Sequence, residues 1–209
     1  MRGCLVVAGG RSTRFGEEDK AVADLAGTPM IRRVVDRVAP VVDELVVNCR
    51  TDQLSTIGDA LVGVEPEPTV VEDPVPDQGP MMGVLAGLRA VESEYTFVVA
   101  CDMPFVDPSL VAFLFDRAEG HDAAVPRTDG RFQTTQAVYR TDAMVNACTA
   151  TLARGERRLS EALSELEWVT IDREPIECHA SIETFENLNT AEAFEAAADR
   201  LNRNDHGDG

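Results

Sequence analysis

Lysine is almost absent from this sequence, which has 19 lysine and arginine residues together but a single lysine, Lys20. Acidic residues number 37, and the formal net charge is −18 with an isoelectric point near 4.4. A surface of that charge repels nucleic acid and anionic lipid, so neither is an expected partner. The excess of acid indicates a salt-rich cytoplasm that screens charge, although an arginine-biased codon usage would also explain the missing lysine.

Long apolar runs are missing too: no stretch approaches the roughly 20 residues that a membrane span needs, and no signal-peptide pattern opens the chain. The five cysteines show no C-x-x-C or other metal spacing, and their odd number favours a reducing cytoplasm over a disulfide framework. We therefore expect a cytoplasmic protein. Residues 1–202 should form one domain and residues 203–209 a disordered tail.

Short apolar strands alternate with helical patterns along the chain. The expected strands are Gly3–Ala8, Glu44–Cys49, Thr69–Val71, Tyr95–Cys101, Ala123–Pro126 and Gln136–Tyr139. The expected helices are Pro29–Val38, Asp52–Ala60, Met81–Glu92, Pro108–Glu119, Thr141–Ala153, Arg158–Leu166 and Thr190–Asn202. This alternation predicts an α/β fold in three layers, with a mostly parallel twisted sheet between helices on both faces. Ligands of such sheets bind beyond the carboxyl ends of the strands.

A glycine pair follows the first expected strand, in the stretch Ala8-Gly-Gly-x-Ser-x-Arg-Phe-Gly-x₃-Lys20. Gly9 and Gly10 let the backbone turn and approach a ligand closely, and N–H groups in such a turn can point at phosphate oxygens. Arg11, Arg14 and Lys20 add positive charge. The spacing fits neither G-x-x-x-x-G-K-[ST] nor G-x-G-x-x-G, so neither a P-loop nor a dinucleotide fold is indicated.

Polar groups end three further strands. Asn48 could pair with a base edge or cap a turn. Asp73 precedes a helix rich in small residues, among them Gly83, which permit close approach to the sheet or to a ligand. Asp102 could hold Mg²⁺, which takes one or two carboxylates together with phosphate oxygens and water. Its alternative role as a helix cap is better filled by Asp107.

The glycine-loop string resembles the nucleotidyltransferase superfamily, and the four strand ends in this order resemble the molybdenum cofactor guanylyltransferases. Segments 128–140, 154–158 and 185–194 extend the resemblance to roughly residues 3–200. Ala191 stands where that family often has proline, and Thr134 follows Gln133 where a proline is also frequent. The resemblance implies a Rossmann-like nucleotidyltransferase fold.

It also implies the roles of individual residues. Val7, Ala8 and Gly9 would lie against guanine and ribose, Gly10 and Arg11 would continue the nucleotide loop, and Lys20 would contact the phosphates. By the same resemblance, the nucleoside would be held by Asn48 and Asp73, the metal ion by Asp102, and the active-site face would be ordered by Asn187 and Asn189.

The reaction expected on this basis joins GTP and molybdopterin into a dinucleotide cofactor and releases pyrophosphate. Lys20, Arg14 and Asp102 with Mg²⁺ would be its catalytic groups, and Arg11 would help to neutralise the pyrophosphate. The acceptor's phosphate would be bound by guanidinium groups from among Arg131, Arg154, Arg157 and Arg158. We expect a monomer or weak oligomer that contacts molybdopterin-delivering or molybdoenzyme-maturation proteins transiently.

Three alternatives stay open. The same chemistry could use CTP with molybdopterin, or GTP with a cobinamide phosphate. A non-catalytic nucleotide-binding assembly protein could use this fold, but loss of Lys20 or Asp102 would favour that class and both are present. A sugar-nucleotide synthase should carry a longer sugar-binding region than this C-terminal half provides.

Overall fold

The strands of the computed structural model, which describes residues 1–10, 19–73 and 80–205, form one main sheet and a two-stranded ribbon. The strands are β1 Arg2–Val7, β2 Asp24–Leu25, β3 Thr28–Pro29, β4 Glu44–Cys49, β5 Thr69–Glu72, β6 Tyr95–Ala100, β7 Ala123–Thr128, β8 Arg131–Phe132, β9 Gln136–Arg140 and β10 Trp168–Ile171. The α-helices are α1 Met30–Val38, α2 Leu54–Ala60, α3 Pro80–Leu88, α4 Pro108–Ala118, α5 Thr141–Ala153, α6 Leu159–Ala162, α7 Arg173–Glu177 and α8 Ala191–Asp205. Within these described ranges, none of the helices is both long and apolar enough to cross a membrane.

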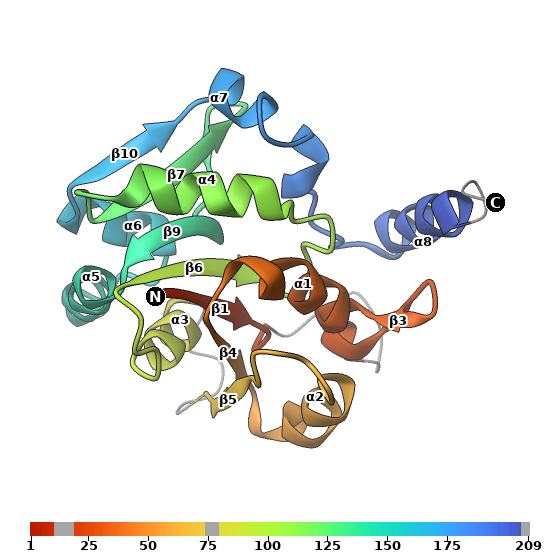
Figure 1. The fold of residues 1–209 in the computed structure, drawn as a ribbon. Coiled ribbons are helices and arrows are strands. Elements are labelled where there is room, and N and C mark those ends of the chain that lie inside the picture. The colour runs from red at the N-terminus through yellow and green to blue at the C-terminus, as the bar shows by residue number, and fades with distance from the viewer. Residues whose placement is uncertain (11–18, 74–79, 206–209) are drawn as a thin grey trace.

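The main sheet has the strand order β10-β7-β9-β6-β1-β4-β5, with β8 attached to β7 (Figure 1). Its pairs are parallel except where β9 meets β6 and β7 and where β8 meets β7. The register sets Val7 opposite Asn48 on one side and opposite Ala100 on the other. The prediction of a mostly parallel α/β sheet is confirmed. All four polar strand ends meet at one edge, because β5 is also parallel to β4 and sets Val71 opposite Asn48.

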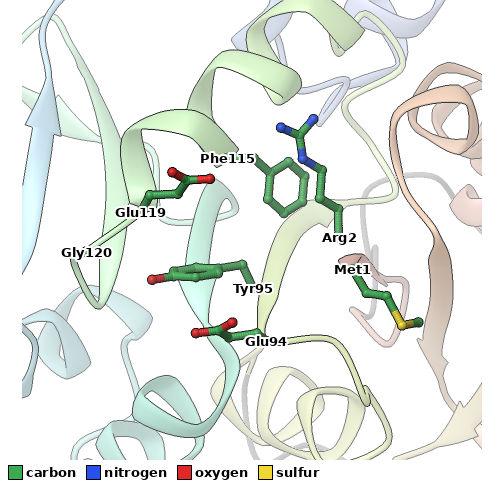
Figure 2. Close-up of a pocket in the computed structure, with 7 residues that line it drawn as sticks. All are labelled: Met1, Arg2, Glu94, Tyr95, Phe115, Glu119 and Gly120. Atoms are coloured by element: carbon green, nitrogen blue, oxygen red, sulfur yellow. The ribbon is translucent and has the colours of Figure 1, made fainter.

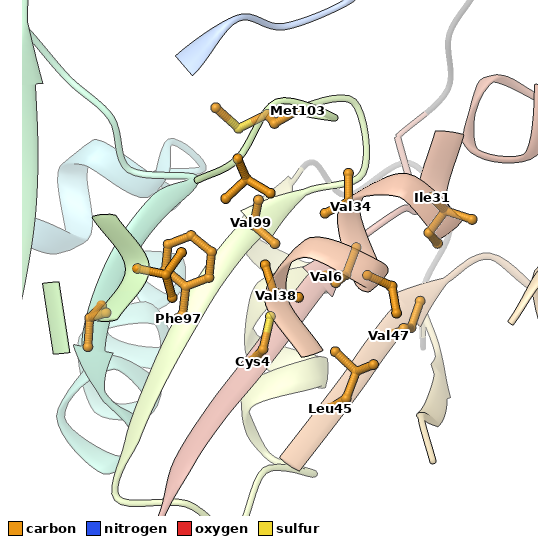
Figure 3. Close-up of a cluster of buried hydrophobic side chains, with 14 of the residues drawn as sticks. Cys4, Val6, Ile31, Val34, Val38, Leu45, Val47, Phe97, Val99 and Met103 are labelled. Atoms are coloured by element: carbon orange, nitrogen blue, oxygen red, sulfur yellow. The ribbon is translucent and has the colours of Figure 1, made fainter. Parts of the chain in front are cut away.

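Side chains of the central strands alternate between two buried faces, because successive residues of a strand point to opposite sides. Cys4, Val6, Val47 and Phe97 lie on one face, where they pack against α1 and α4 (Figure 3). Leu5 and its neighbours in the sheet lie on the other face, against α3 and α5. Each large apolar side chain buried in this way contributes about 1.5–3 kcal/mol, so both helical layers are fixed to the sheet.

The C-terminal helix α8 packs outside these two layers. A separate apolar cluster joins Ala197 of α8 to Leu25, Met30 and Leu188, beside the short ribbon of β2 and β3. Figure 1 shows α8 projecting at the side of the molecule where β3 lies. This packing brings the chain just before α8 to the edge of the sheet where the strands end.

Several elements differ from the sequence-based expectation. The expected helix Arg158–Leu166 is divided into α6 and a 3-10 helix, Leu163–Glu165, which Leu166 closes by donating its N–H to the carbonyl of Leu163 at 3.3 Å. Strand β10 was not predicted. Helix α8 continues to Asp205, past the expected start of the tail at position 203, and residues 206–209 lie outside the described part.

Candidate functional site

Backbone hydrogen bonds hold the ends of β1, β4 and β6 together at the carboxyl edge of the sheet. Ala8 donates its N–H to the carbonyl of Asn48 at 2.8 Å, and Cys101 donates to the carbonyl of Val7 at 3.1 Å. The buried amide of Gln53 donates to the carbonyl of Ala8 at 3.1 Å. The chain that enters the glycine turn therefore has a fixed direction.

Arg50 holds the glycine turn from the other side. Its guanidinium donates to the carbonyl of Gly10 at 3.1 Å and forms ion pairs with Asp19 and Asp52 at 3.4 and 3.0 Å. The charge of Arg50 is thus shared between two carboxylates and the turn. Arg11 and Arg14, which were predicted to bind phosphate, lie outside the described residues.

The carboxylate of Asp73 and the amide of Asn48 converge on two glycines. A Cβ atom at Gly9 would collide with the carboxylate of Asp73, and one at Gly83 would lie 2.5 Å from Oδ1 of Asn48 and 3.1 Å from Oδ1 of Asp73. Only glycine fits these two positions without displacing a neighbour. The predicted close approach of α3 to the sheet is confirmed. Gly9, Asn48 and Asp73 lie together, and their role in binding a nucleoside stays a prediction.

Three oxygen atoms at this edge are buried and have no hydrogen-bond partner among the described residues: Oδ1 of Asn48, Oδ1 of Asp73 and Oδ1 of Asp102. Each such atom costs about 1–3 kcal/mol, because it has lost water without gaining a donor. Two other atoms share this condition, Oε1 of Gln136 at the start of β9 and Nε of Arg200 in α8. The first three match the places where a ligand's donors or a cation would bind.

Burial raises the pKa of Asp73 above its ordinary value, although a hydrogen bond from Asn48 and the positive charge of Arg50 act in the opposite direction. The folded chain thus disfavours the charged form of this carboxyl. A ligand that donates hydrogen bonds to Asp73 would relieve that cost.

Lys20 lies at the centre of the remaining polar cluster. It begins a 3-10 helix, Lys20–Val22, and its side chain is buried, with 8% of the residue exposed. Its Nζ donates to Oδ2 of Asp102 at 2.8 Å and to Oδ1 of Asn189 at 3.0 Å. Lys20 and Asp102 were predicted to share a site, but the direct ion pair between them was not foreseen.

The segment that carries Asn189 is fixed by contacts with the loop after β6. Leu188 donates its N–H to the carbonyl of Asp102 at 3.0 Å. Deeper in the molecule, Thr184 accepts hydrogen bonds from the amide of Gln136 at 2.8 Å and from the N–H of Asp107 at 3.0 Å. The loop after β6, the start of β9 and the segment before α8 therefore form one connected unit beside Asp102.

Asp107 also confirms a prediction made from the sequence. Its side chain accepts a hydrogen bond from the N–H of Ser109 at 2.8 Å and so caps α4. Asp102 has no role in that cap, and its Oδ1 stays without a partner at the edge of the sheet.

The arginines expected to bind an acceptor's phosphate are spread more widely. Arg131 lies in β8 opposite Thr128, at the end of β7 on the same edge of the sheet. Arg154 forms ion pairs with Glu156 and Glu165 at 3.1 and 2.9 Å. Arg157 and Arg158 are exposed, the latter directly before α6.

A hollow opens at the opposite edge of the sheet, where β1 and β6 begin (Figure 2). Its volume is about 390 Å³. It is lined by Met1, Arg2, Glu94, Tyr95, Phe115, Glu119 and Gly120.

Two of the polar groups in this hollow already have partners. Arg2 pairs with Asp116 at 2.7 Å and lies over the ring of Phe115, and Tyr95 donates its hydroxyl to the carbonyl of His121 at 3.3 Å. The unpartnered oxygens at the carboxyl edge make that edge the better candidate site.

Sequence comparison decides the family. A model of the MobA-like NTP transferase domain matches residues 4–167. This chain belongs to that family. The protein is therefore a transferase enzyme, and enzymes of this family generally use a divalent metal ion.

Curated relatives resemble this chain over almost its whole length. A probable molybdenum cofactor guanylyltransferase from Natronomonas pharaonis is 47% identical over 94% of this chain and 96% of its own. A molybdenum cofactor guanylyltransferase from Pseudomonas putida is 34% identical over 91% of this chain and 94% of its own.

Among solved structures, molybdopterin-guanine dinucleotide biosynthesis protein A from Archaeoglobus fulgidus superimposes with a TM-score of 0.79 at 24% identity, covering 96% of this chain and 99% of its own. This likeness shows that the two proteins share a fold.

Proposed function

We propose that this enzyme transfers GMP from GTP to molybdopterin, forming a guanine dinucleotide cofactor and pyrophosphate. The curated relatives named above support the choice of reaction. The proposal assigns the reaction to particular residues because three buried oxygens, on Asn48, Asp73 and Asp102, have no hydrogen-bond partner. These atoms require donors or a cation, and a magnesium nucleotide supplies both.

The nucleoside would bind between the glycine turn and α3. Guanine carries hydrogen-bond donors on its ring nitrogen and its amino group, and ribose carries two hydroxyls. Asn48 and Asp73 offer acceptor oxygens that converge beside Gly83, and glycine at position 9 lets the carboxylate of Asp73 lie against the turn. Satisfying the two acceptors would recover about 1–3 kcal/mol for each.

Asp102 fits the role of a magnesium ligand. Its Oδ1 is a hard oxygen donor with no partner. The described part of the chain holds no group of three His, Cys, Asp or Glu side chains suited to a metal, so a metal ion would need ligands from the nucleotide as well. Mg²⁺ tolerates a single protein carboxylate when phosphate oxygens and water complete its octahedron. When bound, it would neutralise charge on the triphosphate.

The chemical step needs alignment and charge neutralisation rather than proton transfer. An oxygen of the acceptor's terminal phosphate attacks the α-phosphorus, and the bond to the bridging oxygen breaks with its electron pair leaving on pyrophosphate. The attacking phosphate is already ionised, so no general base is required. Lys20 would donate to the phosphates, and Arg11 and Arg14 would add positive charge, which reduces the repulsion between two anions.

The acceptor would approach from the side of β7 and β9. Arg131 stands at that part of the edge, and Arg154, Arg157 and Arg158 are the other candidates for its phosphate. The five cysteines are all unpaired, which agrees with work in a reducing cytoplasm. We expect a monomer or weak oligomer in transient contact with proteins that deliver molybdopterin or mature molybdoenzymes.

Product analysis tests this proposal. The enzyme is incubated with molybdopterin, Mg²⁺ and either GTP or CTP, and the products are identified by mass spectrometry. We expect the GMP adduct and pyrophosphate in equal amounts, with CTP at least about tenfold slower because its base leaves an acceptor unmet. A CMP adduct formed as fast as the GMP adduct would assign the enzyme to cytidylyl transfer.

The matched variant is Asp102→Asn, which preserves size and removes the charge. It should retain the fold and lose metal-dependent transfer. Turnover within about threefold of the original enzyme, roughly 0.7 kcal/mol, would remove Asp102 from the metal role.

A further inference from the structure

The ammonium group of Lys20 forms an ion pair with Asp102, the carboxylate that is proposed to hold the metal. Nζ lies 2.8 Å from Oδ2 of Asp102, and Asn189 holds the same ammonium from a second side at 3.0 Å. The pair is enclosed, with side-chain exposures of 9% for Lys20 and 18% for Asp102. Charge–charge interactions are stronger here than on the open surface, because less water surrounds them.

A divalent cation and this ammonium are poorly compatible on one carboxylate. Mg²⁺ binds oxygen at about 2.0–2.1 Å. A cation on Asp102 would thus lie within a few ångströms of Nζ, and the two like charges would repel each other strongly. A triphosphate changes this balance because its oxygens supply negative charge to both cations.

We propose that Lys20 is an internal cation that excludes the metal from Asp102 until a nucleotide arrives. The nucleotide's phosphates then take the ammonium from Asp102, and the carboxylate becomes available to the metal. Asn189 is a positioning residue in this exchange, since it holds Lys20 in the excluding position. The inference rests on the proposed metal role of Asp102 and adds an order of events to it: metal binds with the nucleotide, not before.

This exclusion has a measurable consequence. Removing Lys20, which is needed for transfer, should increase the affinity of the nucleotide-free protein for the metal ion. We would measure Mn²⁺ affinity of the nucleotide-free protein by electron paramagnetic resonance, with the original chain, Lys20→Met, Asn189→Ala and the double variant Lys20→Met/Asp102→Asn. Arg173→Met is the matched control, because it removes one positive charge from an exposed side chain that pairs with Glu177.

We expect Lys20→Met to bind Mn²⁺ at least about tenfold more tightly than the original chain, which corresponds to 1.4 kcal/mol. Asn189→Ala should give a smaller gain, Arg173→Met none, and the double variant should lose the gain. Added Mn²⁺ should also raise the melting temperature of Lys20→Met more than that of the original chain, because the metal replaces the missing partner of Asp102.

Unchanged Mn²⁺ affinity in both Lys20→Met and Asn189→Ala would overturn the exclusion. If Lys20→Met does not fold, Asn189→Ala decides the matter alone. A gain that persists in the double variant would also overturn it, since the new site would not be Asp102.

Failure of the metal role itself is detected separately, by calorimetry of GTP with and without Mn²⁺. If Asp102→Asn keeps the full enhancement of GTP affinity by Mn²⁺, the proposed metal role of Asp102 fails. If the enhancement is lost in Asp102→Asn while Lys20→Met shows no gain, the metal role stands and only the exclusion is rejected.

Discussion

Asp73 illustrates how a residue can be placed for binding at the expense of stability. Its carboxylate is partly buried beside Gly9 and Gly83, one of its oxygens lacks a partner, and burial raises its pKa. A group arranged in this way stabilises the complex with a ligand that donates hydrogen bonds. It destabilises the folded protein when no such ligand is bound. Binding sites commonly show this conflict between stability and function.

The first prediction follows from the sign of that pKa shift. The folded chain binds the Asp73 proton more tightly than the unfolded chain does, so this group favours folding below about pH 3.8 and loses that effect as the pH rises through the folded pKa. Asp73→Asn does not titrate. The melting temperature of the original chain relative to Asp73→Asn should therefore fall as the pH rises above about 3.8, by about 2–4 °C for each kcal/mol of stability that is lost.

Asp73→Asn should be the more stable protein at neutral pH but should bind GTP more weakly. We expect its GTP affinity to be about tenfold lower, because one charged acceptor is lost. Calorimetry and thermal unfolding on the same preparations check both effects. A melting difference that stays constant with pH would show that Asp73 has an ordinary carboxyl environment.

The second prediction concerns the shape of the cation at position 20. Lys20→Ala should lower the rate of pyrophosphate release by about 10²–10³-fold, the usual cost of losing one group that stabilises transition-state charge. Lys20→Arg should be impaired less but clearly, because a planar guanidinium is larger than the ammonium that fits between Asp102 and Asn189. Full activity of Lys20→Arg would mean that charge alone suffices, and full activity of Lys20→Ala would refute the phosphate role.

At the residue scale, much of the site could be predicted from the sequence. Asn48 lies near the end of an apolar strand, Asp73 and Asp102 follow strands, and parallel strands end at one edge. The partners of these residues could not be predicted. Lys20 reaches Asp102 from a position 82 residues away, and Gln53, which resembles a surface residue of a helix start, turns its amide inward to the carbonyl of Ala8.

Two glycines of helix α3, Gly83 and Gly87, lie against different neighbours, and this separates binding from packing. A methyl group at Gly83 would lie 2.5 Å from Oδ1 of Asn48, whereas one at Gly87 would collide with the buried side chain of Leu5. Gly83→Ala should weaken GTP binding by about tenfold or more through displacement of the Asn48 amide.

Two controls separate binding from folding. Gly87→Ala should destabilise the protein by about 1–3 kcal/mol of overpacking, with GTP affinity nearly unchanged. Gly58→Ala in α2, where the new methyl group meets nothing within 4 Å, should be neutral or slightly stabilising. GTP affinity of Gly83→Ala equal to that of Gly58→Ala would show that α3 does not shape the nucleoside site.

Element boundaries were predicted best where the sequence is most regular. The buried central strands and α5 agree with expectation because their apolar pattern leaves little choice. Strand β10, Trp168–Ile171, lies at the edge of the sheet and pairs with β7 alone in the main sheet. It has only four residues, and Thr170 interrupts its apolar sequence, so the pattern is too short to predict a strand. Such a strand depends on its neighbour more than on its own sequence.

For the whole molecule, the net charge of −18 leads to a prediction about salt. Repulsion among the acidic side chains destabilises the compact state, and salt screens it, with a Debye length of about 10 Å at 0.1 M and 3 Å at 1 M. The melting temperature should rise by at least about 5 °C between 0.1 M and 1 M KCl, some 1–2 kcal/mol at this chain length. A melting temperature independent of KCl would show that the acidic surface does not limit stability.

Three of the five buried side-chain atoms without a partner in the described part of the molecule lie where its parallel strands end, and they are the basis of the proposed function. The most direct test is a crystal structure with GTP and Mn²⁺, in which anomalous scattering locates the metal. We predict guanine or ribose donors within hydrogen-bond distance of Asn48 and Asp73, Mn²⁺ on Asp102, and Lys20 on the phosphates. A nucleotide bound elsewhere, or bound here with Asn48 and Asp73 still unpartnered, would contradict the account.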